Sequence, residues 1–539
     1  MTLESLKDKT LRGIHDLKKD IAETCAAQEA KVHQLKVVAQ TGGLGGLLNT
    51  ILHPSPAPEG KIKNGTFTNW GGNQSFKPTE ILNPETLEDL VDIVHKAQKT
   101  GKKIRCAGSG HTWSSSSVTD GYLVVMNKMQ KVFEPVFDSE KGWTVELETG
   151  VLVSDLDNAL RRHNPPLALP SNVVLDSVRY GGILSLGCHG AGTYTRTLPD
   201  LVSEVKIVDA TGTLNTFTPE KNPEEFSAAC VNLGLLGLIY TYTMRVEPMF
   251  KMHMTDTYPP LSDYFASSEL SGPKLKAMVL ANDSTEIFYW PFNTAGLGRA
   301  NDHLWIKQWQ RTKDLPVTVS PSKEGFTKLW QGYETEFGEH LYEHMATHPS
   351  SAPFVNCLLF QAIGGKDAEV VLEAPDAIHY QAGIDNLPCV DMEMALKVNE
   401  DFSNVVVAWN FVIDQLYEYA KRGEFPLNLT LEMRFVKASS LLMSAAYDED
   451  PEAIYCMMEI LSVKNTKGFD EFASMIAKFW MDQFNARPHW AKMWEYVPGI
   501  VPYLRKQSGD RYNRFETVRR KYDPSGMFMN ATFAGILGH

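Results

Sequence analysis

The stretch IRCAGSGHTWSSSS, residues 104–117, limits the fold more than any other part of the sequence. A short apolar run ends at Gly108-Ser109-Gly110, where the lack of side chains lets backbone N–H groups approach an anion such as phosphate. No lysine follows Gly110, and no GxGxxG pattern opens a helix, so neither a P-loop nor a Rossmann loop is indicated. The hydroxyl residues 114–117 follow instead and are suited to donate hydrogen bonds to a pyrophosphate.

Two more glycine-rich stretches lie downstream, at 180–193 (YGGILSLGCHGAGT) and at 232–240 (NLGLLGLIY). Taken singly, each is compatible with an ordinary tight turn. Three of them within one α+β unit indicate a long, phosphate-bearing ligand bound in an extended form, such as a dinucleotide.

Helix and strand patterns alternate in the segment that contains these loops. Thr86 and Asp89 form a weak version of the capping box ahead of an apolar helical face, and Gly101 is placed to end that helix. Further strand, helix and hairpin patterns occur at 103–108, 142–150, 153–163 and 201–217. From about residue 250 the amino-acid composition changes, with more Trp, Tyr, Met and Pro, which predicts a second domain.

The N-terminal region has a different character. Apolar residues at three-to-five-residue spacing predict a helix over 1–40, and the Gly/Pro-rich segment 41–60 reads as a connector. This region carries no chemical motif, so its removal is expected to leave the ligand site intact.

Charge and cysteine content narrow the function classes. The formal net charge is −13, which argues against nucleic acid or an anionic membrane as the main partner. The seven cysteines are scattered without a CxxC pair, and no apolar run approaches the roughly 20 residues of a spanning helix. We therefore expect reduced thiols in an intracellular, cytoplasmic protein.

The order of the motifs resembles that of vanillyl-alcohol-oxidase-type (PCMH) flavoproteins, in particular sugar-1,4-lactone oxidases and alditol oxidases. NWGGNQSFKPTEILNPETLEDLVDIVHKA resembles the start of the FAD domain, and AGSGHTWSS and GGILSLGCHGAG resemble its two phosphate loops. LTLEMRFVKAS resembles the Glu-x-Arg strand, and ARPHWAKMW resembles a Pro-His-Trp-Gly-Lys segment with Ala491 in place of glycine. YNRFETVRRKYDPSGMFMNATFAGILG resembles the closing helix and tail, so that the resemblance covers about residues 66–538.

The resemblance implies an α+β, two-domain fold whose cap domain carries a large antiparallel sheet. The expected divisions are an N-terminal extension (1–65), an FAD-binding domain (66–250), a cap domain (251–480) and a C-terminal segment that completes the site (481–539).

The implied cofactor is FAD, attached covalently through His111. The other residues expected to contact FAD are Gly108, Ser109, Gly110, Thr112, Ser115, Ser116, Gly182, Ser185, Gly187, Cys188, His189, Gly190, Gly237 and Ile239. Cys188 could also be imagined as a second flavin tether, but the doubly linked relatives place their cysteine earlier, where this chain has Ser171 and Ser177.

The implied reaction is hydride transfer from a carbinol carbon of an aldonolactone or polyol to flavin N5, with dioxygen then reduced to hydrogen peroxide. Glu432 and Arg434 stand two apart on a predicted strand and so share a face. By resemblance Glu432 takes the hydroxyl proton, Arg434 stabilises an oxyanion, and Lys492 stabilises the reduced flavin. His489 belongs to the same expected catalytic set.

Alternatives remain open from the sequence. Thr149-Gly150 lies where the family controls oxygen access but fits neither pattern cleanly, so a dehydrogenase competes with an oxidase. The aromatic segment 286–310 would suit a natural-product oxidase with a larger substrate, and a non-enzyme reading would leave the Glu432/Arg434/Lys492 set idle. Finally, His340, His344 and His348 have metal-ligand spacing, but the chain lacks an HExxH pair, and we expect no metal.

Overall fold

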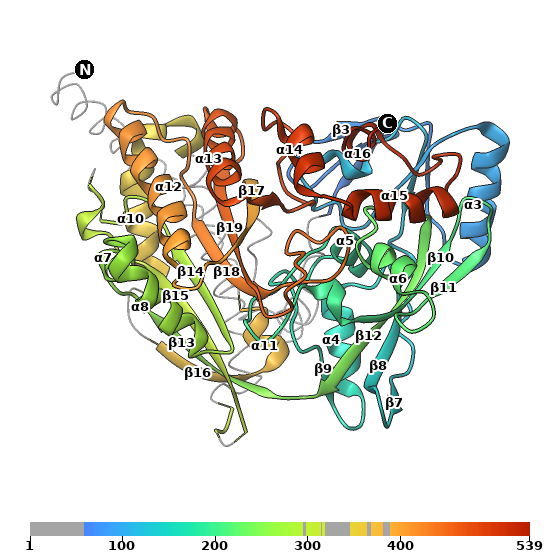
Figure 1. The fold of residues 1–539 in the computed structure, drawn as a ribbon, viewed down its shortest axis with the longest axis horizontal. Coiled ribbons are helices and arrows are strands. Elements are labelled where there is room, and N and C mark those ends of the chain that lie inside the picture. The colour runs from blue at the N-terminus through green and yellow to red at the C-terminus, as the bar shows by residue number, and fades with distance from the viewer. Residues whose placement is uncertain (1–58, 295–297, 314, 318–344, 364–367, 381–388) are drawn as a thin grey trace, which may run out of the picture.

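The computed structural model describes residues 59–294, 298–313, 315–317, 345–363, 368–380 and 389–539. Its two larger sheets, of six and eight strands, lie in opposite halves of the molecule (Figure 1). The chain passes from one to the other where strand β12 (Leu238–Pro248) is followed two residues later by β13 (Lys251–Thr257). The helix predicted for 1–40, together with His340 and His344, lies outside the described residues.

The first half contains two three-stranded sheets and the six-stranded sheet. One small sheet is antiparallel, β1-β2-β3, and the other is parallel, β4-β6-β5. The six-stranded sheet has the order β11-β10-β12-β8-β7, with β9 paired to β12. The strands are β1 (Lys61–Lys63), β2 (Thr66–Thr68), β3 (Ser75–Phe76), β4 (Glu80–Leu82), β5 (Ile104–Ala107), β6 (Tyr122–Val125), β7 (Val136–Asp138), β8 (Gly142–Glu148), β9 (Leu167–Ala168), β10 (Val202–Val208) and β11 (Leu214–Phe217).

The second half is built on the eight-stranded sheet, whose order is β16-β13-β15-β14-β18-β19-β17-β20. All of its pairings are antiparallel, which confirms the large antiparallel sheet expected there. Its remaining strands are β14 (Ser284–Tyr289), β15 (Trp305–Thr312), β16 (Ala368–Glu373), β17 (Cys389–Lys397), β18 (Leu431–Lys437), β19 (Ile454–Val463) and β20 (Arg487–Pro488).

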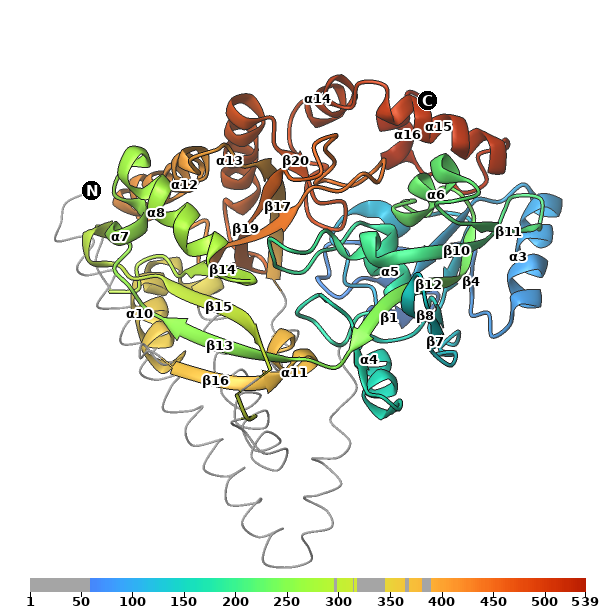
Figure 2. The ribbon, with the colours of Figure 1, turned by 60° about the horizontal axis from the view of Figure 1, so that its bottom comes forward.

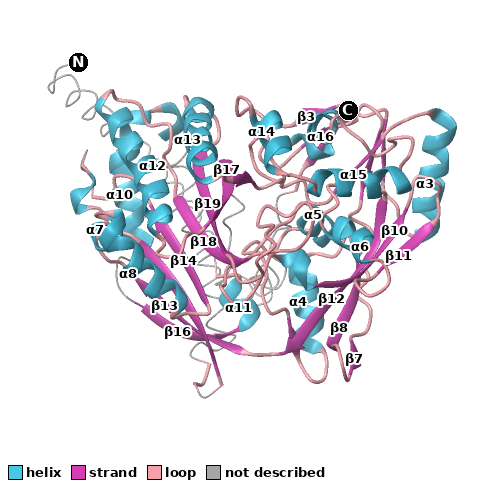
Figure 3. Ribbon diagram, in the orientation of Figure 1, coloured by secondary structure: helices cyan, strands magenta, loops and turns pink. Residues whose placement is uncertain are grey.

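Helices cover the outer face of the eight-stranded sheet and leave its other face toward the first half (Figures 1, 2 and 3). Trp409 of α12 and Trp480 of α13 are fully buried there, and the Trp480 indole donates to the Ala408 carbonyl at 3.1 Å. The helices are α3 (Leu87–Thr100), α4 (Val153–Arg162), α5 (Tyr180–Ser185), α6 (Pro223–Cys230), α7 (Ser262–Phe265), α8 (Ser268–Leu280), α10 (Ala352–Ile363), α11 (Ala374–Ile378), α12 (Ser403–Lys421), α13 (Phe469–Phe484), α14 (Ile500–Gln507), α15 (Arg511–Tyr522) and α16 (Ala531–Leu537). None of the described helices is long and apolar enough to cross a membrane.

Local signals in the sequence account for several of these elements. α3 begins at a capping box in which the Thr86 hydroxyl accepts from the Asp89 N–H and the Asp89 carboxylate accepts from the Thr86 N–H, and it ends at Gly101 in the left-handed region. The predicted strand, helix and hairpin at 142–150, 153–163 and 201–217 are also present, as β8, α4 and β10–β11.

The first described residues tie the chain to the glycine loop. The Gly60 N–H donates to the Ser109 carbonyl at 2.8 Å, and the Glu59 carboxylate pairs with Arg179 at 2.5 Å. We predict that removing residues 1–58 leaves the cofactor absorbance spectrum unchanged. Removing residues 1–60 should instead lower the free energy of unfolding by about 1–3 kcal/mol, because both contacts are lost. Thermal denaturation and absorbance spectra of the two truncated proteins test this, and loss of the cofactor from the shorter truncation would contradict it.

Candidate active site

Two adjoining cavities lie along the glycine loops, and most of the expected cofactor residues line them. The first, cavity 1, extends from the loop at 108–112 to the inner face of the eight-stranded sheet. The second, cavity 2, runs along 181–186 and 232–239. Both are lined by Cys106, Ala107, Gly108, Ser116, Gly182 and Leu186. Two adjoining cavities with glycine loops in their shared wall suit an extended dinucleotide.

The loop after β5 places His111 on the wall of cavity 1. Gly110 has φ +74°, and a Cβ there would lie 3.0 Å from the Gly60 Cα, so the tight turn requires glycine at this position. The His111 ring stacks on Trp70, with a centroid distance of 4.8 Å and an interplanar angle of 10°. The ring therefore has a defined orientation at the cavity wall.

The two downstream loops also shape the cavities. The side of Gly182 where a Cβ would stand has no described atom within 4 Å, which leaves room for a ligand. Gly237, with φ +151°, packs so closely that a Cβ would come 2.3 Å from the Val208 carbonyl oxygen. These observations fit the dinucleotide predicted from the sequence.

The expected cofactor residues do not all reach the cavities. Ser115, Gly187 and Gly190 line neither one. Ser115 lies in a 3₁₀ turn (Ser115–Ser117) and its hydroxyl donates to Glu495 at 2.8 Å instead. Those that line cavity 1 or cavity 2 are Gly108, Ser109, Gly110, His111, Thr112, Ser116, Gly182, Ser185, Cys188, His189, Gly237 and Ile239.

Two residues discussed for other roles also face the cavities. Thr149 lines cavity 2, where its hydroxyl donates to the Ile239 carbonyl at 3.2 Å, and a Cβ on Gly150 would lie 1.9 Å from the Met126 carbonyl oxygen. Cys188 lines cavity 1, and burial raises the pKa of its thiol to about 12. The Cys188 thiol therefore stays protonated and is a poor nucleophile at neutral pH.

Strand register places three glutamates side by side on the inner face of the eight-stranded sheet. Glu459 of β19 is directly opposite Glu393 of β17 on one side and Glu432 of β18 on the other. Arg434 is in turn opposite Glu286 of β14. All four glutamates are at least nine-tenths buried, and like charges so placed repel each other unless cations offset them.

Cations from the same sheet and from the C-terminal part of the chain offset these charges. Arg434 pairs with Glu432 at 3.0 Å, with Glu286 at 3.3 Å and with Glu459 at 3.8 Å. The Lys492 ammonium, which is carried by the loop after β20, pairs with both Asp391 and Glu459. The expected catalytic residues Glu432, Arg434, His489 and Lys492 thus all line cavity 1.

The charge cluster shifts the pKa values of its carboxyl groups. Burial and the neighbouring Glu459 raise the pKa of Glu432 to about 7, despite the opposing charge of Arg434. Burial, with Glu459, also raises the pKa of Asp391 well above its usual range. Glu432 can therefore exchange a proton near neutral pH, as a general base requires, whereas Asp391 keeps its proton.

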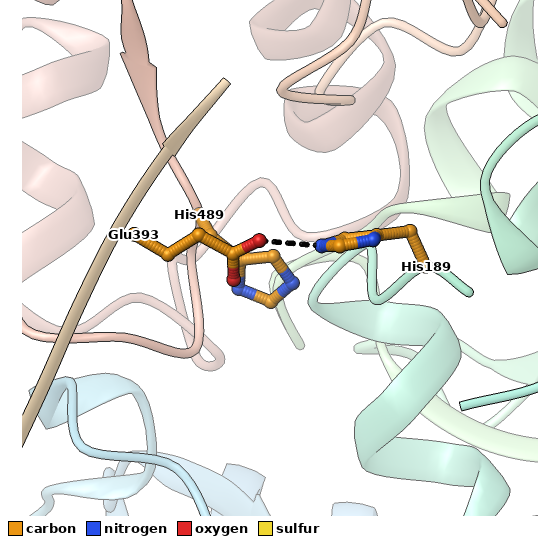
Figure 4. A group of neighbouring side chains, drawn as sticks. All are labelled: His189, Glu393 and His489. Carbon is orange, nitrogen blue, oxygen red and sulfur yellow. Dashed lines mark hydrogen bonds and ion pairs between the residues drawn. The ribbon is translucent and has the colours of Figure 1, made fainter. Parts of the chain in front are cut away.

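A buried group of two histidines and a glutamate closes one end of the cluster (Figure 4). His189 Nε2 lies 2.6 Å from Glu393 Oε1, and His189 Nδ1 lies 2.8 Å from the Gly190 carbonyl oxygen, so both ring nitrogens face acceptors. The His489 ring lies 5.6 Å from that of His189. Burial lowers the pKa of His489 to about 4, and its Nδ1 accepts from the Ala491 N–H at 3.1 Å.

This group has the composition of a metal site, because ligand atoms of His189, Glu393 and His489 all lie within 4.8 Å of one another. Two ligands of a tetrahedral Zn²⁺ ordinarily lie about 3.3 Å apart. The 2.6 Å between His189 and Glu393 is shorter, so these two side chains bond directly to each other.

Several site residues were not predicted from the sequence. Asp391, Glu393 and Glu459 are acidic residues in otherwise apolar strands, and Asp391 and Glu393 repeat the two-residue spacing of Glu432 and Arg434. That spacing is a signal that could have been used. Arg105, which precedes the first glycine loop and lines cavity 2, was not predicted as a site residue either.

Comparisons with known proteins agree with this architecture. A profile of the FAD binding domain matches residues 78–218, and a profile described as D-arabinono-1,4-lactone oxidase matches residues 242–535. Similar proteins include L-gulonolactone oxidase of Scyliorhinus torazame, which is 24% identical over 86% of this chain and 96% of its own length. L-gulono-1,4-lactone dehydrogenase of Mycobacterium tuberculosis is 22% identical over 88% of this chain and 99% of its own.

Two further matches complete the picture. D-arabinono-1,4-lactone oxidase of Eremothecium gossypii is 24% identical over 87% of this chain and 94% of its own length. Among solved structures, a cholesterol oxidase from B. sterolicum superimposes with a TM-score of 0.72 at 18% identity, covering 90% of this chain and all of the other. At that identity the superposition supports the fold alone, and it agrees with the PCMH-type fold expected from the sequence.

The buried His189–Glu393 pair generates a stability prediction. Burial alone would raise the pKa of Glu393, but the neighbouring His189 charge lowers it below its usual range. Replacing Glu393 by Gln removes the carboxylate partner of the buried His189 and should lower the free energy of unfolding by about 3 kcal/mol at pH 7. A carboxyl group whose pKa is lower in the folded than in the unfolded protein stabilises the fold at pH values above its unfolded pKa. The stability difference between the wild-type protein and Glu393→Gln should therefore shrink as the pH falls below about 4.

Urea unfolding followed by circular dichroism measures this difference. Glu400→Gln is the matched control, since Glu400 is exposed in the loop that follows β17, and its substitution should change stability by less than about 0.5 kcal/mol. Equal effects of the two substitutions at pH 7 would show that the His189–Glu393 pair does not stabilise the fold.

Proposed function

The chain belongs to the D-arabinono-1,4-lactone oxidase family, and on that premise we propose that it oxidises a carbinol carbon of an aldonolactone with FAD and passes the electrons to dioxygen. It is an FAD-dependent oxidoreductase that acts on CH–OH groups. The observation that carries the proposal is the Glu432–Arg434 pair on the wall of cavity 1, with the pKa of Glu432 near neutrality. Bound FAD supplies the hydride acceptor and the centre at which dioxygen is reduced to hydrogen peroxide.

Glu432 acts on the hydrogen atom and Arg434 on the oxygen atom of the same hydroxyl group. As hydride leaves the carbon, Glu432 removes the hydroxyl proton, while Arg434 stabilises the negative charge that develops on the oxygen. The Thr430 hydroxyl donates to Glu432 Oε1 at 2.6 Å and Arg434 donates to Glu432 Oε2 at 3.0 Å. These two bonds fix the orientation of the carboxylate before substrate arrives.

Lys492 and His489 serve the cofactor side of the cavity. Because Asp391 keeps its proton, Glu459 is the charged carboxylate among the two that Lys492 contacts. Lys492 then supplies positive charge where negative charge accumulates on reduction. His489, neutral at pH 7, accepts at Nδ1, so its ring proton is on Nε2.

Dioxygen as the acceptor and the exact lactone are tested together. A panel of aldonolactones and polyols, scored for hydrogen peroxide in air and for dye reduction without oxygen, should give turnover on a lactone with peroxide formed one-for-one. Dye reduction on a lactone without peroxide would identify a dehydrogenase, as one relative is named. Turnover of polyols but not of lactones would show that the substrates are polyols and not aldonolactones.

Variants of the catalytic set should have separable effects on anaerobic cofactor reduction. Arg434→Ala should slow it by about a hundredfold, or about 3 kcal/mol, and Glu432→Gln should slow it without changing FAD content. Lys492→Met should slow reduction and weaken the sulfite adduct. The effects should not add, because the residues act on one transition state. Lys437→Gln is the control, because Lys437 is on the opposite face of β18, and it should be reduced at the wild-type rate. Wild-type rates of reduction in Glu432→Gln and Arg434→Ala would show that the reaction takes place at another site.

The pH dependence of reduction follows from the same carboxyl group. Since the pKa of Glu432 is raised to about 7, the base is protonated and inactive below that pH. The rate constant for reduction should therefore rise about tenfold per pH unit below 7 and level off above it. Stopped-flow reduction across pH 5–9 measures this rate constant. In Glu432→Gln the rate constant should no longer rise between pH 5 and 7.

We further propose that FAD is joined to His111. Its ring faces cavity 1 and is held by Trp70, which supports the attachment expected from the sequence. The denatured protein should remain yellow and fluorescent on an electrophoresis gel, and His111→Ala should still bind FAD, more weakly and reversibly. Release of all flavin by acid precipitation of the wild-type protein would refute the covalent bond.

A further inference from the structure

Arg105 is the second residue of β5, three positions before Gly108 of the first glycine loop, and is only 3% exposed. Its guanidinium donates four hydrogen bonds, and all four go to backbone carbonyl oxygens. They join Nε to Ser116 at 2.7 Å, Nη1 to Gly234 at 2.8 Å and to Phe528 at 2.6 Å, and Nη2 to Leu233 at 2.7 Å. One side chain thus holds together three segments that are far apart in the sequence.

The charge of Arg105 has no acidic partner within the part of the chain that the structure describes. By contrast, the buried Arg179 pairs with Glu59 at 2.5 Å. Burial of the uncompensated guanidinium lowers the pKa of Arg105 to about 10, so that it still carries its proton at neutral pH. A buried charge of this kind is costly unless an opposite charge approaches it.

The position of Arg105 identifies where such a charge would come from. Arg105 and its partners Ser116, Leu233 and Gly234 all line cavity 2, and Ser116 also lines cavity 1. If the flavin half of an extended FAD occupies cavity 1 beside His111 and the adenosine half occupies cavity 2, the two phosphates would lie at the junction where the cavities adjoin. The diphosphate is the only ionised part of FAD at neutral pH.

We propose that the guanidinium of Arg105 is the counter-charge of the FAD diphosphate and that Arg105 is the positioning residue of the cofactor site. Four of its five N–H groups hold the turn at 115–117, the loop at 232–234 and the C-terminal residues around the junction. The fifth N–H and the net charge serve the phosphates. The proposal concerns FAD binding and does not depend on which substrate is oxidised.

The test uses the full chain in the His111→Ala background, in which FAD binding is reversible. FAD dissociation constants are measured by flavin fluorescence for the parent, Arg105→Gln and Arg105→Lys, and ADP and adenosine are compared as competitors. Arg511→Gln is the matched control. Arg511 is also buried, burial lowers its pKa to about 10, and it donates to the Ser444 carbonyl at 3.2 Å, but it lines neither cavity.

Arg105→Gln keeps a neutral donor group, with two N–H bonds in place of the four that the guanidinium uses, and removes the charge. It should raise the FAD dissociation constant at least about tenfold and reduce the preference for ADP over adenosine by a similar factor. Arg511→Gln should leave that preference unchanged. An unchanged FAD affinity, or an equal loss of ADP and adenosine binding, would overturn the proposal, because a purely structural arginine affects both ligands alike.

Arg105→Lys provides a second route if the glutamine variant does not fold. A lysine ammonium buried at this position should have a lowered pKa. FAD affinity of the lysine variant should then fall between pH 7 and 9, while the parent, whose arginine stays charged, changes less. Parallel pH profiles of parent and lysine variant would contradict the diphosphate role.

Discussion

Everything at the candidate active site follows from the register of three neighbouring strands. β17, β19 and β18 pair so that Glu393, Glu459 and Glu432 stand directly opposite one another and face the same cavity. Adjacent buried carboxylates cannot all ionise without cations nearby, so the sheet face is stable only when other groups supply positive charge or protons. Arg434 and Lys492 supply the charge, His189 bonds directly to Glu393, and Asp391 keeps a proton.

The same constraint explains why the site is assembled from both halves of the molecule. Arg434 comes from the sheet itself, but His189 comes from the second glycine loop and Lys492 from the segment after β20. The buried carboxylates therefore bond to side chains from the second glycine loop and from the C-terminal part of the chain, and these contacts hold both segments against the sheet face. Glu432 is the member whose balance of burial, repulsion and Arg434 attraction brings the pKa of its carboxyl group close to 7, which suits it to proton transfer.

The sequence predicted the elements whose cause is local. The capping residues of α3, the hairpin at β10–β11 and the shared face of Glu432 and Arg434 depend on neighbours a few residues away, and each is present in the structure. The role of Glu393 and Glu459 could not be predicted in this way, because it depends on which strands pair and in which register. Ser115 is a residue that was predicted for the site but does not reach it. It lies in a 3₁₀ turn, and its hydroxyl donates to Glu495 instead of facing a cavity.

The tail of the chain contacts residues beside the first glycine loop. The Ile104 N–H donates to the Met527 carbonyl at 2.9 Å, Arg105 donates to Phe528, and the Asn530 amide donates to the Ser115 carbonyl at 3.0 Å. A chain cut before Met527 would keep every glycine loop but lose these three contacts. The walls of the cavities are therefore complete only once residues 527–530 have been synthesised, although every glycine loop is made earlier.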